Sequence, residues 1–136
     1  REVISTLENK ESHYAPIYPD EMSLEDKIHT VATKIYGADD VTYTATAKKQ
    51  LAKITEMGFG NLPVCMAKTQ YSLSDDPKKL GRPQNFDITV REAYVSAGAG
   101  FVVALTGSIV TMPGLPKRPA AFDIDVDESG KIVGLF

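Results

Sequence analysis

The side chains Lys68, Thr69 and Gln70 have the types and the position expected of a ligand site. They follow the apolar run 63–67, which predicts a buried strand, and they open a polar loop that ends near residue 85. In open α/β sheets, ligands commonly lie beyond the carboxyl ends of the strands. We therefore predict that these three side chains form a polar wall of a ligand cleft. The alternative is loop anchoring, in which Thr69 and Gln70 bond their own backbone.

The stretch 106–116 is the second candidate, because it mixes hydroxyl groups with rigid apolar side chains. Two prolines around a glycine end any regular element there. We expect the stretch to be ordered and well packed, and to line a substrate cleft or a subunit contact. A proline-braced connection in the core is the alternative. The side chains to which we assign binding are Thr106, Ser108, Met112 and Leu115.

Charged side chains offer weaker candidates. Arg82 and Arg91 could each pair with an anion, but Arg91 lies on the wet face of an alternating strand, where an ordinary salt bridge is commoner. Asp75 and Asp76 are adjacent carboxylates in a loop, a position more typical of turns than of Mg²⁺ binding. We therefore predict neither a catalytic residue nor a metal ligand among them.

Three further aspartates and the thiol complete the list of reactive groups. Asp123, Asp125 and Asp127 alternate on one strand face, which could hold a cation but fits a solvated face better. Cys65, the only cysteine, lies in an apolar strand and is expected to be inert. A single cysteine cannot form an internal disulfide, which suits a reducing compartment. With two scattered histidines, His13 and His29, the chain also lacks the ligands of a structural zinc site.

Two helices are predicted to support these groups. Ser23 is a good N-cap, apolar side chains then recur on one face, and Gly37 is a stop signal, so we expect a helix over 24–36. A second helix begins after Thr44 or Thr46 and ends at 58–60. Its apolar side consists of Ala47, Leu51, Ile54 and Met57.

The rest of the chain predicts strands. The segment 39–43 is short and can form a strand, and 132–136 closes a hairpin on 122–127. We predict a mixed α/β fold in which helices near the N-terminus pack on a mainly β sheet. That sheet is expected to include 63–67, 86–92, 101–105 and 121–126. Residues 1–22 are interpreted as a lead-in segment from a missing upstream region, or a frayed end, and residues 23–136 as one domain.

Composition excludes several classes of function. A length of 136 residues suffices for one hydrophobic core. A net charge of −3 argues against nucleic-acid binding, which usually needs clustered positive charge. No apolar run approaches the roughly 20 residues that a bilayer-spanning helix needs. No secretory signal is visible at the start, and we expect no membrane partner.

Four sequence blocks carry a resemblance to a known family. They are 34–39 (KIYGAD), 58–72 (GFGNLPVCMAKTQYS), 96–101 (SAGAGF), and the end of the chain, 105–120 with 123–127 and 134–136. In order and spacing they resemble the C-terminal portion of the formate–tetrahydrofolate ligases, also called formyltetrahydrofolate synthetases. Each block alone is weak, but together they span residues 34–136.

The resemblance implies an ATP-dependent ligase that formylates tetrahydrofolate at N10 from formate through formyl phosphate. Formate, MgATP and tetrahydrofolate would be the substrates, and the family leaves room for a monovalent cation. It also implies a cytoplasmic homo-oligomer, commonly a tetramer. The short blocks at 68–72 and 105–108 look more like the stand-alone bacterial form than the fused eukaryotic one.

The family's phosphate-binding loop, a glycine-rich segment ending in Gly-Lys-Ser/Thr, is absent from this sequence. Gly98 and Gly100 are not followed by Lys-Ser or Lys-Thr, and Lys68-Thr69 has no glycine loop before it. The family's aromatic pair that sandwiches the pterin also lies upstream. We therefore expect this chain alone to be inactive. The alternative is a non-enzymatic binding or interaction module that retains the fold.

Overall fold

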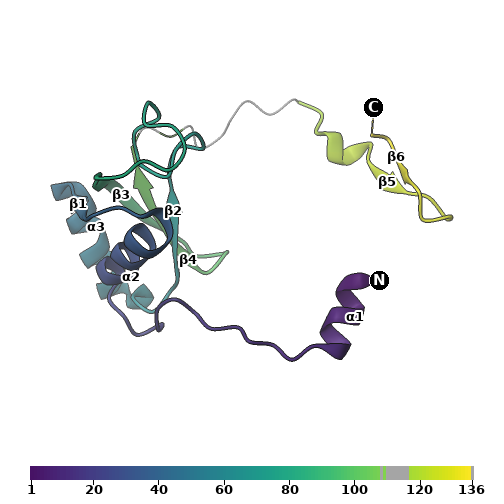
Figure 1. Cartoon of the computed structure of the whole chain (residues 1–136), viewed down its shortest axis with the longest axis horizontal. Coiled ribbons are helices and arrows are strands. Elements are labelled where there is room, and N and C mark those ends of the chain that lie inside the picture. The colour runs from purple at the N-terminus through teal and green to yellow at the C-terminus, as the bar shows by residue number, and fades with distance from the viewer. Residues whose placement is uncertain (108, 110–116, 136) are drawn as a thin grey trace.

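The computed structural model describes residues 1–107, 109 and 117–135. A body of helices and a four-stranded sheet stands apart from two outlying segments, helix α1 (Glu2–Asn9) and a C-terminal hairpin (Figure 1). Three of the side chains that the sequence assigns to binding, Ser108, Met112 and Leu115, lie outside the described residues, as does most of the stretch 106–116. Within the described residues, no helix is long and apolar enough to cross a membrane.

The predicted helix over 24–36 is confirmed as α2 (Leu24–Val31) followed by a π-helical turn, η1 (Ala32–Tyr36). Its N-terminus is capped in both directions. Ser23 Oγ accepts from the amide of Asp26 at 3.1 Å, and its hydroxyl donates to Asp26 Oδ2 at 2.6 Å. Gly37 ends the helix in the left-handed region at φ 75°, a conformation that favours glycine.

The second predicted helix is α3 (Ala45–Ile54), which continues into the π-helical turn η2 (Thr55–Phe59). Thr44 caps it by accepting a hydrogen bond from the amide of Ala47 at 3.1 Å. Ala47, Leu51 and Ile54 are buried as predicted. Met57 lies beyond α3, in η2, and is half-exposed.

The main sheet has the order β1-β3-β4-β2. Its strands are β1 (Val41–Tyr43), β2 (Val64–Ala67), β3 (Ile88–Ser96) and β4 (Phe101–Thr106). The central pair β3–β4 is antiparallel, whereas the outer strands β1 and β2 each join it in parallel. Because β2 and β4 run parallel, their carboxyl ends lie side by side at the same end of the sheet.

The prediction that 63–67 is a buried strand is wrong in one respect. The strand exists as β2, but it lies at the edge of the sheet, and Cys65 is exposed. Only α2 packs extensively on it besides its neighbour β4. An unbroken apolar run cannot distinguish a strand covered on both faces from an edge strand covered on one.

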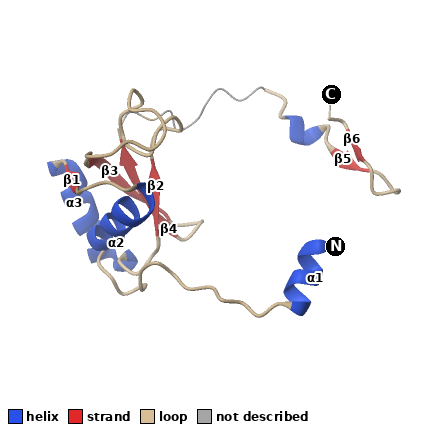
Figure 2. Cartoon of the chain, viewed as in Figure 1, coloured by secondary structure: helices blue, strands red, loops and turns tan. Residues whose placement is uncertain are grey.

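The prediction that 121–126 belongs to the main sheet is also wrong. Ala120–Phe122 forms a 3-10 turn, η3, and only β5 (Asp125–Val126) is a strand. It pairs in antiparallel fashion with β6 (Ile132–Val133) in a separate two-stranded sheet, so the predicted hairpin itself is confirmed (Figure 2). Apolar side chains do alternate along this segment, but no buried face results, because Phe122 and Val126 remain 73% and 59% exposed.

The core lies between helices α2 and α3 and the sheet. Helix α1 contributes nothing to it, because none of its residues is buried. Its apolar side chains Val3, Ile4 and Leu7 all face solvent. The residues of the core cluster are Leu24, Ile28, Ala32, Ala38, Val41, Ala47, Leu51, Ile54, Phe86, Ile88, Val90, Ala93, Val102 and Ala104.

Candidate functional site

The carboxyl ends of β2 and β4 bring together the first candidate residues. Ala67 pairs with Leu105, so Lys68, just after β2, lies beside Thr106, the last residue of β4. Thr106 is fully buried, and its hydroxyl donates to the carbonyl of Ala67 at 3.1 Å. The sequence offered Lys68 and Thr106 as members of two separate candidate stretches, and this bond shows that Thr106 ties the two strand ends to each other.

Lys68 is held against the protein by its own loop. Its ammonium group donates to the carbonyl of Thr69 at 2.8 Å and to the carbonyl of Ser72. It also lies 5.3 Å from the centre of the Tyr36 ring, within cation–π range. Burial lowers the pKa of Lys68 below its usual value. An ammonium group has three N–H donors, so two carbonyls leave one donor for a further acceptor.

Thr69 and Gln70 differ in what they offer. Thr69 is buried, and its hydroxyl oxygen accepts from the amide of Tyr71 at 3.3 Å, which is the anchoring geometry that the sequence left open. Gln70 is exposed, and its side chain makes no hydrogen bond with another described residue. Of the three residues 68–70, Gln70 therefore presents the most polar surface to a ligand.

The loop after Gln70 is fixed by a serine pair that the sequence analysis missed. Ser72 and Ser74 are buried, and their hydroxyl oxygens lie 2.9 Å apart. Ser72 Oγ also accepts from the amide of Ser74 at 3.0 Å, while Ser74 Oγ accepts from the amide of Asp76 at 3.1 Å. Two serines separated by one residue in a long polar loop were the available signal, since such hydroxyls often bond nearby backbone.

Asp75 and Asp76 bond backbone amides. Asp75 Oδ2 accepts from the amide of Thr89 in β3 at 2.9 Å, a contact between residues 14 apart. Asp76 Oδ1 accepts from the amide of Lys78 at 2.9 Å within an exposed turn. The turn-forming role predicted for the pair holds for Asp76, whereas Asp75 joins the loop to the sheet.

Arg91 lies at an irregularity of β3, where the register with β4 shifts between Val90 and Glu92. The bulge leaves Arg91 and Glu92 both exposed, although they are neighbours along the strand. Arg91 Nη1 donates to the carbonyl of Gly107 at 3.0 Å. A small cavity of about 170 Å³ adjoins these groups, with Leu105 and Ile109 completing its wall. Arg82 lies elsewhere, against Gly37. A Cβ atom added to Gly37 would stand 3.3 Å from Arg82 Nη2.

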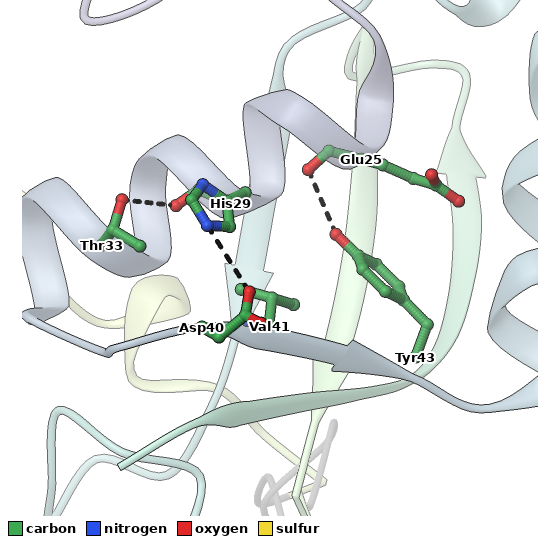
Figure 3. Close-up of polar contacts among 6 residues, drawn as sticks. All are labelled: Glu25, His29, Thr33, Asp40, Val41 and Tyr43. Atoms are coloured by element: carbon green, nitrogen blue, oxygen red, sulfur yellow. Dashed lines mark hydrogen bonds and ion pairs between the residues drawn. The ribbon is translucent and has the colours of Figure 1, made fainter. Parts of the chain in front are cut away.

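A second polar cluster joins α2 to β1 (Figure 3). His29 Nε2 lies 3.6 Å from Asp40 Oδ1, which also accepts from the amide of Val41 at 2.7 Å. The hydroxyl of Tyr43 donates to the carbonyl of Glu25 at 3.1 Å. Burial is the main reason why the pKa of Tyr43 is raised above its usual value. The His29–Asp40 and Tyr43–Glu25 contacts both join α2 to the β1 segment, so the cluster is a structural brace.

Lys27 is the polar residue that the sequence gave no reason to notice. Its side chain is fully buried, and its ammonium group donates to the carbonyls of Asp20 at 2.6 Å, Gly60 at 3.0 Å and Leu62 at 3.1 Å. Burial lowers its pKa, against the opposing effect of nearby carboxylates. All three donors are used, so Lys27 joins three backbone segments and has none left for a ligand.

The aspartates of the C-terminal hairpin serve the hairpin itself. Asp123 forms an ion pair with Arg118, which lowers the pKa of the carboxyl group. Asp127 Oδ1 accepts from the hydroxyl of Ser129 at 2.6 Å and from the amide of Lys131 at 3.0 Å, and these bonds lower its pKa. Among the described residues, no group of three His, Cys, Asp or Glu side chains is placed to hold a metal ion.

The sequence was also compared with models of protein families. The model described as formate–tetrahydrofolate ligase matches residues 1–136. The match therefore includes helix α1, the α/β body and the C-terminal hairpin.

Proposed function

The chain belongs to the formate–tetrahydrofolate ligase family, and we propose that it is the C-terminal portion of an ATP-dependent enzyme that formylates tetrahydrofolate at N10. The match over residues 1–136 is the observation that carries this proposal. The proposal assigns the sheet edge at Lys68 and Gln70 to one wall of the substrate cleft. The candidates Ser108, Met112 and Leu115 follow β4 in the sequence, and the proposal assigns them to the same wall.

The chemistry sets what that wall must supply. A formate oxygen attacks the γ-phosphorus of ATP, which releases ADP and leaves formyl phosphate. The N10 amine then attacks the formyl carbon, the carbon–oxygen bond to phosphate breaks, and the amine loses its proton. Negative charge must be neutralised in the first step, and water must be excluded from the acyl phosphate. Lys68 offers a fixed positive charge with one donor remaining, and Gln70 offers an amide for a neutral polar group.

Catalysis is proposed to need residues beyond this chain. Residues 1–136 contain no glycine-rich loop ending in Gly-Lys-Ser/Thr, which would hold the ATP phosphates. We expect the purified 136-residue chain to form no formyltetrahydrofolate from formate, MgATP and tetrahydrofolate. The full-length enzyme, assayed in parallel, provides the positive control. Product above the no-protein background, growing with the amount of chain added, would refute the assignment.

The proposed cleft wall is tested at Gln70 in the full-length enzyme. We expect Gln70→Ala to lower kcat/KM by about threefold to tenfold, the effect of losing one hydrogen bond to a ligand. Gln84→Ala is the matched control, because Gln84 is an exposed glutamine in the same loop. Steady-state kinetics with each of the three substrates would show which one Gln70 contacts. Equal kcat/KM values for both variants and the parent would remove the 68–70 edge from the cleft.

One observation favours a second candidate function. Thr69 and Thr106 use their hydroxyl groups inside the protein, as a structural or interaction module would require. Under this alternative the chain retains the fold without contributing to substrate binding. The Gln70 comparison separates the two functions, because a module of this kind predicts no kinetic effect. The homo-oligomer implied by the family is also a proposal, which light scattering on the full-length protein would test.

A further inference from the structure

We propose that Asp75 is a positioning residue, which holds the Lys68–Gln70 edge in a fixed place relative to the end of β4. The inference rests on the proposed function, because it assumes that this edge borders the substrate cleft. The Asp75 side chain is not proposed to touch a ligand. It acts through two neighbours, Thr89 in β3 and Gly107 after β4.

The first contact completes the sheet where β4 ends. The amide of Ile88 donates to the carbonyl of Asp40, and the carbonyl of Val90 accepts from the amide of Thr44, so both groups face the β1 side. The amide of Thr89 therefore points to the β4 side, but β4 pairs with β3 only as far as Val90 and Thr106. Asp75 Oδ2 accepts from this amide at 2.9 Å. The carboxylate thus occupies the position that the next residue of β4 would have filled.

The second contact explains why β4 ends there. Gly107 has φ 64°, in the left-handed region, so the backbone turns away from the strand direction. A Cβ atom at Gly107 would lie 2.4 Å from the backbone oxygen of Asp75, so any side chain there would force one of the two segments to shift. The carbonyl of Gly107 is held in turn by Arg91 Nη1. The backbone of Asp75 therefore lies against the point where the chain leaves the sheet.

Hydrogen bonds and the chain itself together link Asp75 to the proposed cleft wall. Ser74, its neighbour, shares a buried hydroxyl contact with Ser72, and the carbonyl of Ser72 accepts from the ammonium group of Lys68. Each of these groups is tied to backbone, so the loop from Lys68 to Asp75 has little freedom to adjust locally. Releasing Asp75 from Thr89 should move Lys68 and Gln70 as well. Small displacements of binding groups lower the rate strongly, because catalysis depends on orientation.

The test compares three variants of the full-length enzyme. Asp75→Ala removes the acceptor for the Thr89 amide, and we expect about a tenfold loss of kcat/KM. Asp75→Asn keeps an amide oxygen in the same place, so kcat/KM should return to within about twofold of the parent. Asp76→Ala is the matched control, because the neighbouring carboxylate bonds only within an exposed turn. Hydrogen exchange at the Thr89 amide should accelerate in Asp75→Ala alone.

The outcomes separate this inference from the proposed function. If Gln70→Ala lowers kcat/KM but Asp75→Ala does not, although the Thr89 amide exchanges faster, the positioning role is overturned and the cleft wall stands. If Asp75→Asn is impaired as much as Asp75→Ala, the hydrogen-bond explanation is overturned. If Gln70→Ala and Asp75→Ala both retain parental kcat/KM, the proposed cleft wall fails, and the inference fails with it.

Discussion

Replacing Lys27 by methionine is expected to lower the free energy of unfolding by about 3 kcal/mol, because it leaves three backbone carbonyls without their donor. Those carbonyls belong to Asp20, Gly60 and Leu62. Methionine fills similar space, so the change removes the ammonium group with little loss of packing. Urea denaturation of the 136-residue chain, followed by circular dichroism, would measure the effect.

The matched control for Lys27 is Lys34→Met. Lys34 lies further along the same helical segment, is exposed and makes no hydrogen bond to another described side chain. Its replacement should change the free energy of unfolding by less than about 0.5 kcal/mol. If the two variants prove equally stable, the three carbonyls are satisfied without Lys27, and the hydrogen bonds of its ammonium group are not a source of stability.

Gly107→Ala is expected to destabilise the chain by about 3 kcal/mol, the combined effect of backbone strain and overpacking. The strain arises from φ 64°, and the overpacking from the backbone oxygen of Asp75, 2.4 Å from the new Cβ atom. Gly100 separates these two causes, because it has φ 75° but open space around it. Gly98 has open space and no positive φ, so it serves as the neutral reference.

Three alanine variants therefore form one series. Gly98→Ala should be near neutral, Gly100→Ala should cost about 1 kcal/mol, and Gly107→Ala should cost clearly more than either. Thermal and urea unfolding of the 136-residue chain would rank them. A Gly107→Ala variant no less stable than Gly100→Ala would mean that Asp75 moves aside at little cost, which would also weaken the positioning role of Asp75.

Local signals in the sequence predicted the elements of the body well. Ser23, Thr44 and Gly37 act through the backbone next to them, so their effect on helix ends can be inferred without knowing the fold. The alternation at 86–92 likewise predicted β3, although the strand begins two residues later and extends to Ser96. Neither signal depends on partners distant in sequence.

The predictions failed where distant parts of the chain decide the result. The apolar run before Lys68 indicated a strand but not its place at the edge of the sheet. The roles of Lys27 and Asp75 depend on acceptors and donors 33 and 14 residues away, which no local pattern encodes. For the candidate site, the sequence offered Lys68 and Thr106 separately and gave no sign that the two lie side by side. It left open that the hydroxyl of Thr106 would be used inside the protein.

The strand order β1-β3-β4-β2 also determines when the sheet can form during synthesis. Both outer strands leave the ribosome before the central pair with which they must bond. Tyr43 at the end of β1 precedes Thr106 at the end of β4 by roughly 60 residues, a delay of about 3–13 s at typical elongation rates. The hairpin β3–β4 closes locally, so it should form first and act as the template on which β1 and β2 then assemble.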